Sequence, residues 1–369
     1  MINFLLIIFS FLLLLYLVFV VLLTISVYKK TITAEINLSN KIGISIIIPF
    51  KNEANNLKNL LYYLLKQDYN GPWEIILVND CSTDNYIEII KEIPKEIKIP
   101  IKIIDSFYDE NINLTSKQQA LDNGVKHAKY EWCLFTDADM IFEKKWLSYF
   151  AANASNDKDM IFGHTTIIGK DFFSYLQKFQ LEFLFAVAYS FHKLGISSSC
   201  MGNNLMIKKD SYIKLGGQKA IGYSIVEDRD LYNTFRKNKF IIEPVFPFSP
   251  LAATLPCSSI NQFYHQMLRW ARGGFRLSSN LLYIGILFGI QNFAFLFSLF
   301  GMLPYGITLI CFVNFIATIF FLHSVFNKIS STSTAFFFPI YYLFLLIETI
   351  IFLISFVITP QIKWKNKKL

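Results

Sequence analysis

The sequence predicts a doubly wound α/β domain with membrane helices at both ends of the chain. Between residues 41 and 276, short apolar runs alternate with segments of helical periodicity, which is typical of a parallel sheet covered by helices. Long apolar stretches of a length that crosses a bilayer lie outside that range. We therefore expect an N-terminal anchor (1–30), a globular domain (41–276), a membrane region (277–360) and a basic tail (361–369).

The first apolar stretch runs from Phe4 to Val27 without a charge. At about 1.5 Å per residue it spans a hydrocarbon core of roughly 30 Å. A signal peptide is the alternative, but it would have an apolar core of only about 7–15 residues and a small-residue cleavage site. An uncleaved anchor fits better. Three more stretches of membrane length follow the globular domain, with one charged residue among them: Leu281–Leu299, Leu303–His323 and Phe336–Ile358.

The net charge of +8 needs no nucleic-acid partner to explain it. Lys29, Lys30 and the tail at 363–368 flank membrane segments, and the position of these basic residues predicts which side of the membrane they face. Basic residues there mark the cytoplasmic side, so we expect a multi-pass protein of the cell membrane whose globular domain faces the cytoplasm. A cytoplasmic tail requires an even number of C-terminal crossings. One of the three stretches would then be interfacial or re-entrant, and Leu281–Leu299, with two adjacent amide residues, is the best candidate. The charge says nothing of the oligomeric state.

Within the globular domain, the elements follow one another in the order expected of a parallel sheet. Apolar, mostly β-branched runs predict strands, and leucines at helical spacing or a cap followed by an amphipathic pattern predict helices. The expected strands and helices are a strand at 44–49, a helix around 57–65, a strand at 73–78, a helix opening at Ser82–Asp84, a strand at 99–104, a helix at 117–129 and a strand at 132–136.

Acidic and amide residues follow these strands where each one ends, and ligands of doubly wound sheets bind beyond those carboxyl ends. No glycine-rich phosphate cradle occurs in the chain. An acidic edge would therefore hold a phosphate group through a divalent cation, and oxygen ligands favour Mg²⁺ or Mn²⁺ over zinc. The residues at this edge are Asn52, Glu53, Asp80, Asp84, Asp137 and Asp139.

Five motifs complete a known pattern: IPFKNE (48–53), VNDCSTD (78–84), TDADM (136–140), VEDRD (226–230) and QMLRW (266–270). In this order they resemble the family 2 glycosyltransferases, which are inverting enzymes with the A-type nucleotide-sugar fold. The similarity is greatest to the membrane-embedded branch, which includes ceramide glucosyltransferases and the cellulose, chitin, hyaluronan and poly-N-acetylglucosamine synthases. The resemblance covers about residues 41–276 and the flanking membrane segments.

The resemblance implies a UDP-sugar donor and a place for its nucleotide. Pro49, Glu53 and Asp80 would surround a uracil-type base and its ribose. Asp84 could do the same, or could cap a helix or turn. Lys117 would steady the diphosphate as a point charge.

Two acidic pairs carry the implied chemistry. In the D-x-D pair, Asp139 would bind the Mg²⁺ or Mn²⁺ that bridges the diphosphate, and Asp137 would contact the sugar or ribose. In the E-D pair, Asp228 would accept the proton of the attacking acceptor hydroxyl, and Glu227 would orient it. A charged helix N-terminus is the structural alternative for the second pair.

Two further groups of residues would bind substrates. Asn203 and Asn204 would contact the donor sugar. In the Q-x-x-R-W motif, Gln266 and Arg269 would bind acceptor and diphosphate, and Trp270 would offer a flat face to an acceptor or lie at the membrane interface.

The acceptor remains open between a membrane lipid, which the few C-terminal helices favour, and a growing polysaccharide made by a processive synthase. We also expect the aromatic-rich helix at 172–194 to lie at the interface and line the acceptor entry. A non-catalytic nucleotide-binding membrane protein is the alternative from another class, but the complete set of acidic motifs argues against it.

Overall fold

The computed structural model describes residues 2–28, 41–92, 99–155, 157–245, 251–275, 279–329, 338–358, 363–364 and 367–368. Lys29 and Lys30, on which the expected sidedness depends, lie outside them, as does part of the basic tail. The chain divides into two compact units. The sheet unit contains Thr31–Ser174 and Ser198–Pro256; the helical unit contains Met1–Lys30, Tyr175–Ser197 and Cys257–Leu369. The segments at 175–197 and 257–276 thus group with the terminal helices, although we expected them in the globular domain.

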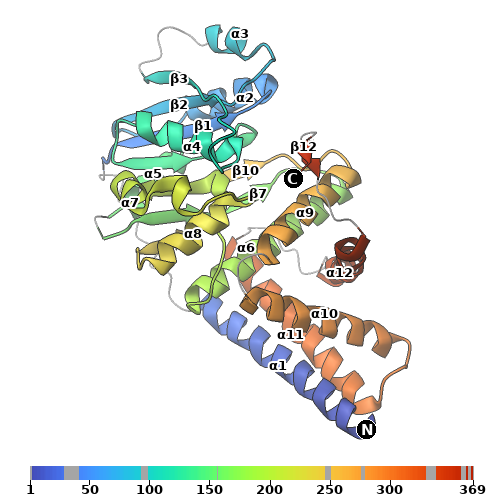
Figure 1. Cartoon of the computed structure of the whole chain (residues 1–369). Helices are drawn as coiled ribbons and strands as arrows, with labels where there is room; N and C mark the ends of the chain where they lie inside the picture. Colours follow the sequence, from blue (N-terminus) through green and yellow to red (C-terminus); the bar gives the residue numbers. More distant parts are fainter. Residues whose placement is uncertain are drawn as a thin grey trace. The chain divides into compact units, whose positions relative to one another are not determined.

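The sheet unit is built on a sheet of seven described strands in the order β3-β2-β1-β4-β8-β6-β9 (Figure 1). All four strands expected from the sequence form, and they pair in parallel. Because β1 lies between β2 and β4, its apolar run is buried along its whole length. The strands of this sheet are β1 (Ile44–Phe50), β2 (Trp73–Asn79), β3 (Ile101–Asp105), β4 (Trp132–Phe135), β6 (Met160–Gly163), β8 (Leu205–Lys208) and β9 (Ile242–Val245).

Helices cover both faces of the parallel strands, which confirms the doubly wound prediction. On one face, leucines of α2 (Ala54–Leu64) pack in a cluster with Ile46 and Ile48 of β1. On the other face, α4 (Ser116–His127) lies so close that a Cβ on Gly124 would stand 2.4 Å from a methyl carbon of Ile47. Side chains alternate along a strand, so neighbouring isoleucines of β1 serve opposite faces.

The other half of the sheet was not predicted from the sequence. Strand β8 runs antiparallel to β4 and places Leu205 opposite Phe135. The start of β8 therefore lies beside the end of β4, at the edge where the D-x-D residues follow. The remaining elements of the sheet unit are α3 (Tyr86–Lys91), α5 (Trp146–Asn153), α7 (Lys209–Leu215), α8 (Glu227–Lys237), the 3₁₀ turns η1 (Gly202–Asn204) and η2 (Gly217–Ala220), and a small sheet of β5 (Met140–Phe142), β10 (Ala252–Thr254) and β7 (Thr165–Ile167).

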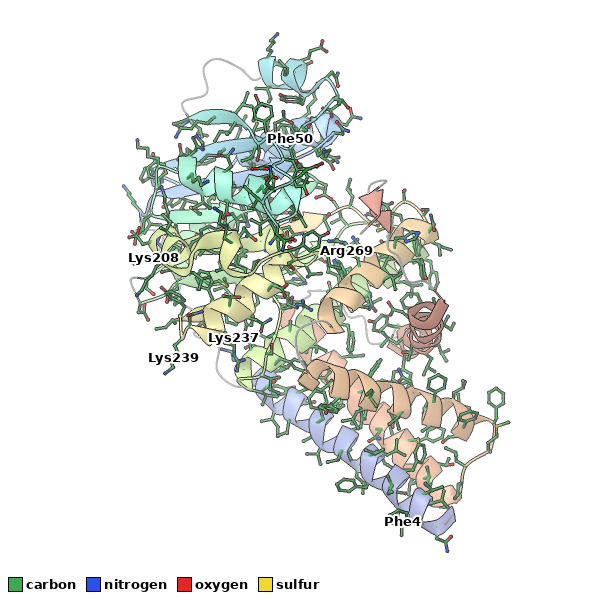
Figure 2. All side chains as sticks on the ribbon, in the orientation of Figure 1. Phe4, Phe50, Lys208, Lys237, Lys239 and Arg269 are labelled. Carbon is green, nitrogen blue, oxygen red and sulfur yellow. The ribbon has the colours of Figure 1, made fainter. Side chains whose placement is uncertain are left out.

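The helical unit contains the expected apolar helices. Helix α1 packs against α11, where Tyr16 and Thr318 share a 3.0 Å hydrogen bond (Figure 1). Its other side is exposed and apolar, as at Phe4, which is 65% exposed (Figure 2). The elements are α1 (Ile2–Tyr28), α6 (Phe172–Lys193, from Tyr175), α9 (Ile260–Phe275), α10 (Ser279–Leu299), α11 (Tyr305–Ile329), α12 (Phe338–Ile358), β11 (Lys363–Trp364) and β12 (Lys367–Lys368).

Among the described residues, Asn3–Tyr28 and Tyr305–Val325 are long and apolar enough to cross a membrane. Tyr283–Leu299 and Ile340–Thr349 are shorter apolar helices. The anchor and the three C-terminal stretches are therefore helical, as expected, whereas their sidedness and the number of crossings stay predictions.

The amides of α10 do not mark it as the interfacial stretch. Gln291 accepts a 2.7 Å hydrogen bond from Asn314 of α11, and Asn292 donates a 3.0 Å bond to Thr349 of α12. Both amides are buried within the helical unit. Their polarity is thus satisfied by neighbouring helices rather than by water, as polar residues between membrane helices commonly are. The amides thus give no support for a re-entrant Leu281–Leu299, which also follows the globular domain directly and stays a prediction.

Helix α6 is mainly a core helix. Phe179, Phe185 and Phe191 are buried, whereas Phe172 and Tyr175 are exposed. Phe191 packs edge-on against Phe19 of α1 at 5.8 Å between ring centroids. Only the exposed aromatic residues remain available for the expected acceptor entry.

Candidate active site

The loops after β1 and β2 are joined to each other by side-chain hydrogen bonds. Asn52 accepts a 2.8 Å bond from the backbone N–H of Thr83, and its own N–H donates a 3.0 Å bond to Ser82. Asn52 and Cys81 both adopt positive φ, at 54° and 55°. Such conformations are costly for residues other than glycine, so the cross-links between the loops are what hold them.

These loops bring the three residues expected around the nucleotide to one edge. Pro49 pairs with Val78 in the sheet, Glu53 is the N-cap residue just before α2, and Asp80 follows β2 in a buried position. Their contact with a base or ribose remains a prediction.

Asp84 caps a helix, but a different one from that expected. Its Oδ2 atom accepts a 2.8 Å hydrogen bond from the N–H of Ala54, the first residue of α2. The following helix, α3, begins only at Tyr86 after Asn85, which makes no side-chain cap bond. The helix opening expected at Ser82–Asp84 is therefore shifted. A capping role accounts for one oxygen of Asp84, and its nucleotide contact stays a prediction.

The D-x-D pair follows β4. Asp137 Oδ1 lies 2.9 Å from Lys117 Nζ. Asp139 is exposed to solvent. Its pKa is nevertheless raised to about 6, first because surrounding protein removes part of its hydration and then because Asp137 and Glu53 are negative. A cation next to Asp139 would relieve the repulsion from these two negative charges.

Lys117 joins the two acidic pairs. It stands in the first turn of α4, and its Nζ atom lies 2.9 Å from Asp137 and 3.0 Å from Glu227. Burial opposes its charge, but the two carboxylates outweigh this and hold the pKa of Lys117 above its ordinary value. The helix start that aims this side chain is fixed by a capping box between Thr115 and Gln118.

Asp228 is held by backbone N–H groups. Its Oδ2 accepts a 2.8 Å bond from Gly202, and its Oδ1 accepts a 2.7 Å bond from Arg229. Burial and the negative charge of Glu227 raise the pKa of Asp228 to about 6, with Lys117 acting in the opposite direction. A pKa near the working pH suits a general base. Gly202 permits this approach, because a Cβ there would stand 2.8 Å from Asp228 Cβ.

The two asparagines after Gly202 have different environments. Asn204 is buried; its Oδ1 accepts a 2.9 Å bond from Trp146 Nε1, and its Nδ2 donates a 2.8 Å bond to the His164 carbonyl. The contacts of Asn204 are therefore structural, and its expected contact with a sugar stays a prediction. Asn203 is partly exposed and accepts a 3.0 Å bond from Thr165, so its contact with a sugar stays a prediction.

A pocket brings most of these groups together. Its lining includes Pro49, Lys117, Asp137, Gly202 and the E-D pair. It also includes Thr136 and Gln218, which sequence reasoning missed. The pocket therefore adjoins both a positively charged side chain and the carboxylate best suited to accept a proton.

Two residues of α4 that were not predicted hold the chain that leads to Asp228. Gln118 accepts a 3.1 Å bond from the N–H of Ser224 and donates a 2.8 Å bond to the Gly222 carbonyl. Asp122 accepts a 2.6 Å bond from Tyr212 and a 3.0 Å bond from the N–H of Gln218. The spacing of Thr115 and Gln118 is a recognisable capping signal, but their long-range partners were not readable from the sequence.

The Q-x-x-R-W residues stand on α9 in the helical unit, where Figure 2 labels Arg269. Gln266 accepts a 3.4 Å bond from the Cys257 thiol, and Met267 and Leu268 are buried. The roles expected for Gln266, Arg269 and Trp270 stay predictions.

Comparison with known proteins finds a family whose model matches most of the parallel sheet and the D-x-D pair. Residues 45–216 match the family model Glycosyl transferase family 2. A poly-beta-1,6-N-acetyl-D-glucosamine synthase of Staphylococcus epidermidis is 27% identical over 240 residues, which are 63% of this chain and 54% of that protein. The enzyme of the same name from Staphylococcus aureus strain MSSA476 is 26% identical over 255 residues, 67% of this chain and 58% of its own length. The chain thus spans about half the length of these relatives.

A solved structure shares the fold. The mannosyltransferase PcManGT from Pyrobaculum calidifontis, in complex with GDP-Man and Mn²⁺, superposes with a TM-score of 0.57 at 14% identity, covering 94% of each chain. At that identity the likeness establishes the architecture alone.

Proposed function

We propose that the protein is a membrane-associated inverting glycosyltransferase that moves a sugar from a UDP-sugar to a hydroxyl group of an acceptor at the membrane. One observation carries the proposal. Lys117 joins Asp137 of the D-x-D pair to Glu227 of the E-D pair, and Asp228 lines the same pocket. Donor-holding groups and a proton acceptor are thus collected at one edge of a family 2 domain.

The transfer needs a base on the acceptor side. Asp228, oriented by two backbone N–H groups, accepts the proton of the acceptor hydroxyl as that oxygen attacks the anomeric carbon. The bond from that carbon to the diphosphate oxygen breaks, and UDP departs. Lys117 holds positive charge beside the departing diphosphate.

The residues present fit a divalent cation of the Mg²⁺ or Mn²⁺ type. Asp139 offers an exposed carboxylate, and the negative charges of Asp137 and Glu53 destabilise its ionised form. Among the described residues no group of three His, Cys, Asp or Glu side chains stands ready to hold a metal alone. Such a cation commonly keeps few protein ligands and takes the rest from phosphate and water. When bound, it stabilises negative charge on the departing diphosphate. Mn²⁺ accompanies GDP-Man in the structure that shares this fold.

The acceptor has two candidates. One is a membrane lipid, which the apolar helices found among the described residues would bring close to the sheet unit's chain. A growing polysaccharide is favoured by the names of the staphylococcal relatives, which are polymer synthases. The proposed setting is the cell membrane with the sheet unit in the cytoplasm, where nucleotide sugars are supplied.

The test uses membranes that contain the full chain, Mn²⁺ or Mg²⁺, and labelled UDP-glucose, UDP-N-acetylglucosamine or GDP-mannose in separate reactions. We expect label to enter a lipid-extractable product with one UDP-sugar, and none with the Asp228→Asn variant. Long polymer from the purified protein would instead favour the synthase. A folded protein that neither transfers nor hydrolyses any of these donors would contradict the proposal.

A further inference from the structure

Two adjacent glutamines of α4 each hold the backbone of a different loop. Gln118 and Gln119 are both buried, at 0% and 9% exposed. Gln119 accepts a 2.9 Å hydrogen bond from the N–H of Asp109 and donates a 2.9 Å bond to the carbonyl of the same residue. Gln118 instead bonds to the chain at 222–224, shortly before the E-D pair. Neighbouring residues of one type thus serve two separate parts of the sheet unit.

The amide of Gln118 is held in one orientation. Its oxygen accepts bonds from the N–H of Ser224 at 3.1 Å and of Thr115 at 3.0 Å, and its nitrogen donates a 2.8 Å bond to the Gly222 carbonyl. A backbone N–H can only donate and a backbone carbonyl can only accept, so this amide cannot turn over without losing its bonds. Thr115 is the N-cap residue of α4. Gln118 therefore ties the start of α4 to the loop at 222–224.

Ser224 passes this restraint on to α8, the helix that begins with the E-D pair. Its hydroxyl accepts a 3.1 Å bond from the N–H of Val226 and donates a 2.5 Å bond to Asp230 Oδ2. Val226 is the N-cap residue of α8 but makes no cap bond with its side chain. The Ser224 hydroxyl thus fixes how the chain enters the helix. Asp228 stands in that first turn, between the two residues that Ser224 holds.

The E-D pair is therefore held by two consecutive residues of α4 in different ways. Lys117 contacts the side chain of Glu227, at 3.0 Å. It is also the residue expected to steady the donor diphosphate, which would compete with Glu227 for its charge. Gln118 acts instead on the backbone before the pair. Because Gln118 is fully buried, its hold on the chain does not depend on whether a donor is bound.

We propose that Gln118 is a positioning residue for the transfer reaction: by holding the chain at 222–224 it keeps Asp228 where that carboxylate can accept the proton of the acceptor hydroxyl. This inference rests on the proposed function. Gln118 is 0% exposed, so it acts through Ser224 and not by contact with a substrate. A misplacement of about 1 Å at a reacting group can lower a rate about 100-fold.

The experiment compares Gln118→Met with Gln119→Met in the full-length protein in detergent. Methionine keeps the length of the side chain and removes its hydrogen bonds. Each change leaves buried backbone groups of one loop without partners, so both should lower the unfolding temperature by a similar amount. Transfer of labelled sugar at varied donor concentration then gives kcat and the donor KM of each variant.

We expect kcat of Gln118→Met to fall about 10- to 100-fold while its donor KM changes less than about 3-fold, because the base is displaced and donor binding is kept. The kcat of Gln119→Met should stay within about 3-fold of the wild-type value. Ser224→Ala removes only the hydroxyl that restrains α8, and it should lower kcat about 10-fold even if Gln118→Met does not fold. Equal losses of kcat in the two glutamine variants would overturn the inference, and so would a Ser224→Ala protein with normal kcat.

A second measurement asks whether Gln118 acts through Asp228. In an Asp228→Asn protein the base is already lost, so adding Gln118→Met should lower the residual transfer less than about 3-fold. A further loss as large as the one in the wild-type background would mean that Gln118 supports the fold in general, and the positioning role would be refuted. Wild-type protein that neither transfers nor hydrolyses any donor would instead contradict the proposed function.

Discussion

The two acidic pairs at the edge of the sheet have the same charge but different surroundings. In each pair one carboxylate is bound to Lys117, namely Asp137 at 2.9 Å and Glu227 at 3.0 Å. The other carboxylate of each pair has a pKa raised to about 6. The similarity ends there, because Asp139 is exposed at the open edge, whereas Asp228 accepts hydrogen bonds from two backbone N–H groups.

That difference indicates how the work is divided. An exposed carboxylate among other acids can exchange water for a cation at low cost. A carboxylate fixed by two N–H groups beside a pocket has one orientation and can meet a hydroxyl group repeatedly in the same geometry. Two aspartates thus differ in exposure and in backbone contacts, and their proposed roles depend on that difference. A motif gives the residue types only and does not show it.

The largest expected effect tests the base. Asp228→Asn keeps the shape and can keep only one of the two backbone hydrogen bonds, because the amide nitrogen cannot accept, and it cannot take a proton at neutral pH. We expect kcat to fall about 10³-fold, within the range of general-base contributions, while UDP binding is retained. The measurement is labelled sugar transfer together with UDP titration by calorimetry.

Asp210→Asn, at an exposed position in the first turn of α7, is the matched control and should transfer normally. The unfolding temperature of Asp228→Asn is measured as a function of pH as well. The raised pKa of Asp228 means that its contribution to stability is fully present below about pH 4 and is lost as the pH rises through about 6. Asp228→Asn should remove that decline in the unfolding temperature. Unchanged turnover in Asp228→Asn would refute the assignment.

The second effect tests the cation side of the comparison. Asp139→Ala should abolish most of the dependence on Mn²⁺ and weaken donor binding, with a loss of about 10²-fold in kcat/KM. Mn²⁺ titration of activity and of UDP-dependent thermal stabilisation measures this. Asp157→Ala removes an exposed acid elsewhere in the sheet unit and should leave the Mn²⁺ titration intact. A normal Mn²⁺ response in Asp139→Ala would show that Asp139 does not bind the cation.

A third variant removes the link between the pairs. Asp228 must be ionised to accept a proton, so wild-type transfer should rise as the pH increases through about 6. Lys117→Met removes a positive charge that lowers the pKa of Asp228, so this rise should move to higher pH, with about a 10-fold loss of rate at neutral pH.

Lys126→Met is the control on the same helix, at an exposed position in its last turn. It should retain both the rate and the pH profile. A Lys117→Met profile that falls in height without moving along the pH axis would assign Lys117 to diphosphate binding alone.

The parallel half of the sheet was predictable because local signals suffice there. Its central strands β1 and β2 are mostly apolar and buried along their whole length, as strands covered on both faces are. Strand β3 is partly exposed but keeps a short run of isoleucines. Strands β6, β8 and β9 have four residues each, which is short for a clear pattern. Strand β4 is equally short, but the alternation of strands and helices before it and the acidic pair after it indicated a strand.

The motifs Asp137-x-Asp139 and Glu227-Asp228 could be found in the sequence, and the structure brings one acid of each to Lys117, whereas their roles stay proposals. The site was not predictable where a role depends on a distant partner. Gln118 and Gln218 are a hundred positions apart and meet only through the fold. The difference between Asn203 and Asn204 likewise arises from Trp146 and the sheet around it.

The smallest effect on catalysis concerns those two asparagines. Asn204→Ala leaves Trp146 Nε1 and the His164 carbonyl without their partner in a buried setting, so we expect the free energy of unfolding to fall by roughly 2–4 kcal/mol. Once the protein is folded, its donor KM should change less than about 3-fold. Asn203→Ala breaks only a half-exposed bond to Thr165 and should unfold nearly as the wild type does, while raising the donor KM if the sugar lies there. Thermal unfolding and donor titration of both variants separate the two roles. A stable Asn204→Ala protein with a greatly raised donor KM would indicate that Asn204 contacts the donor sugar.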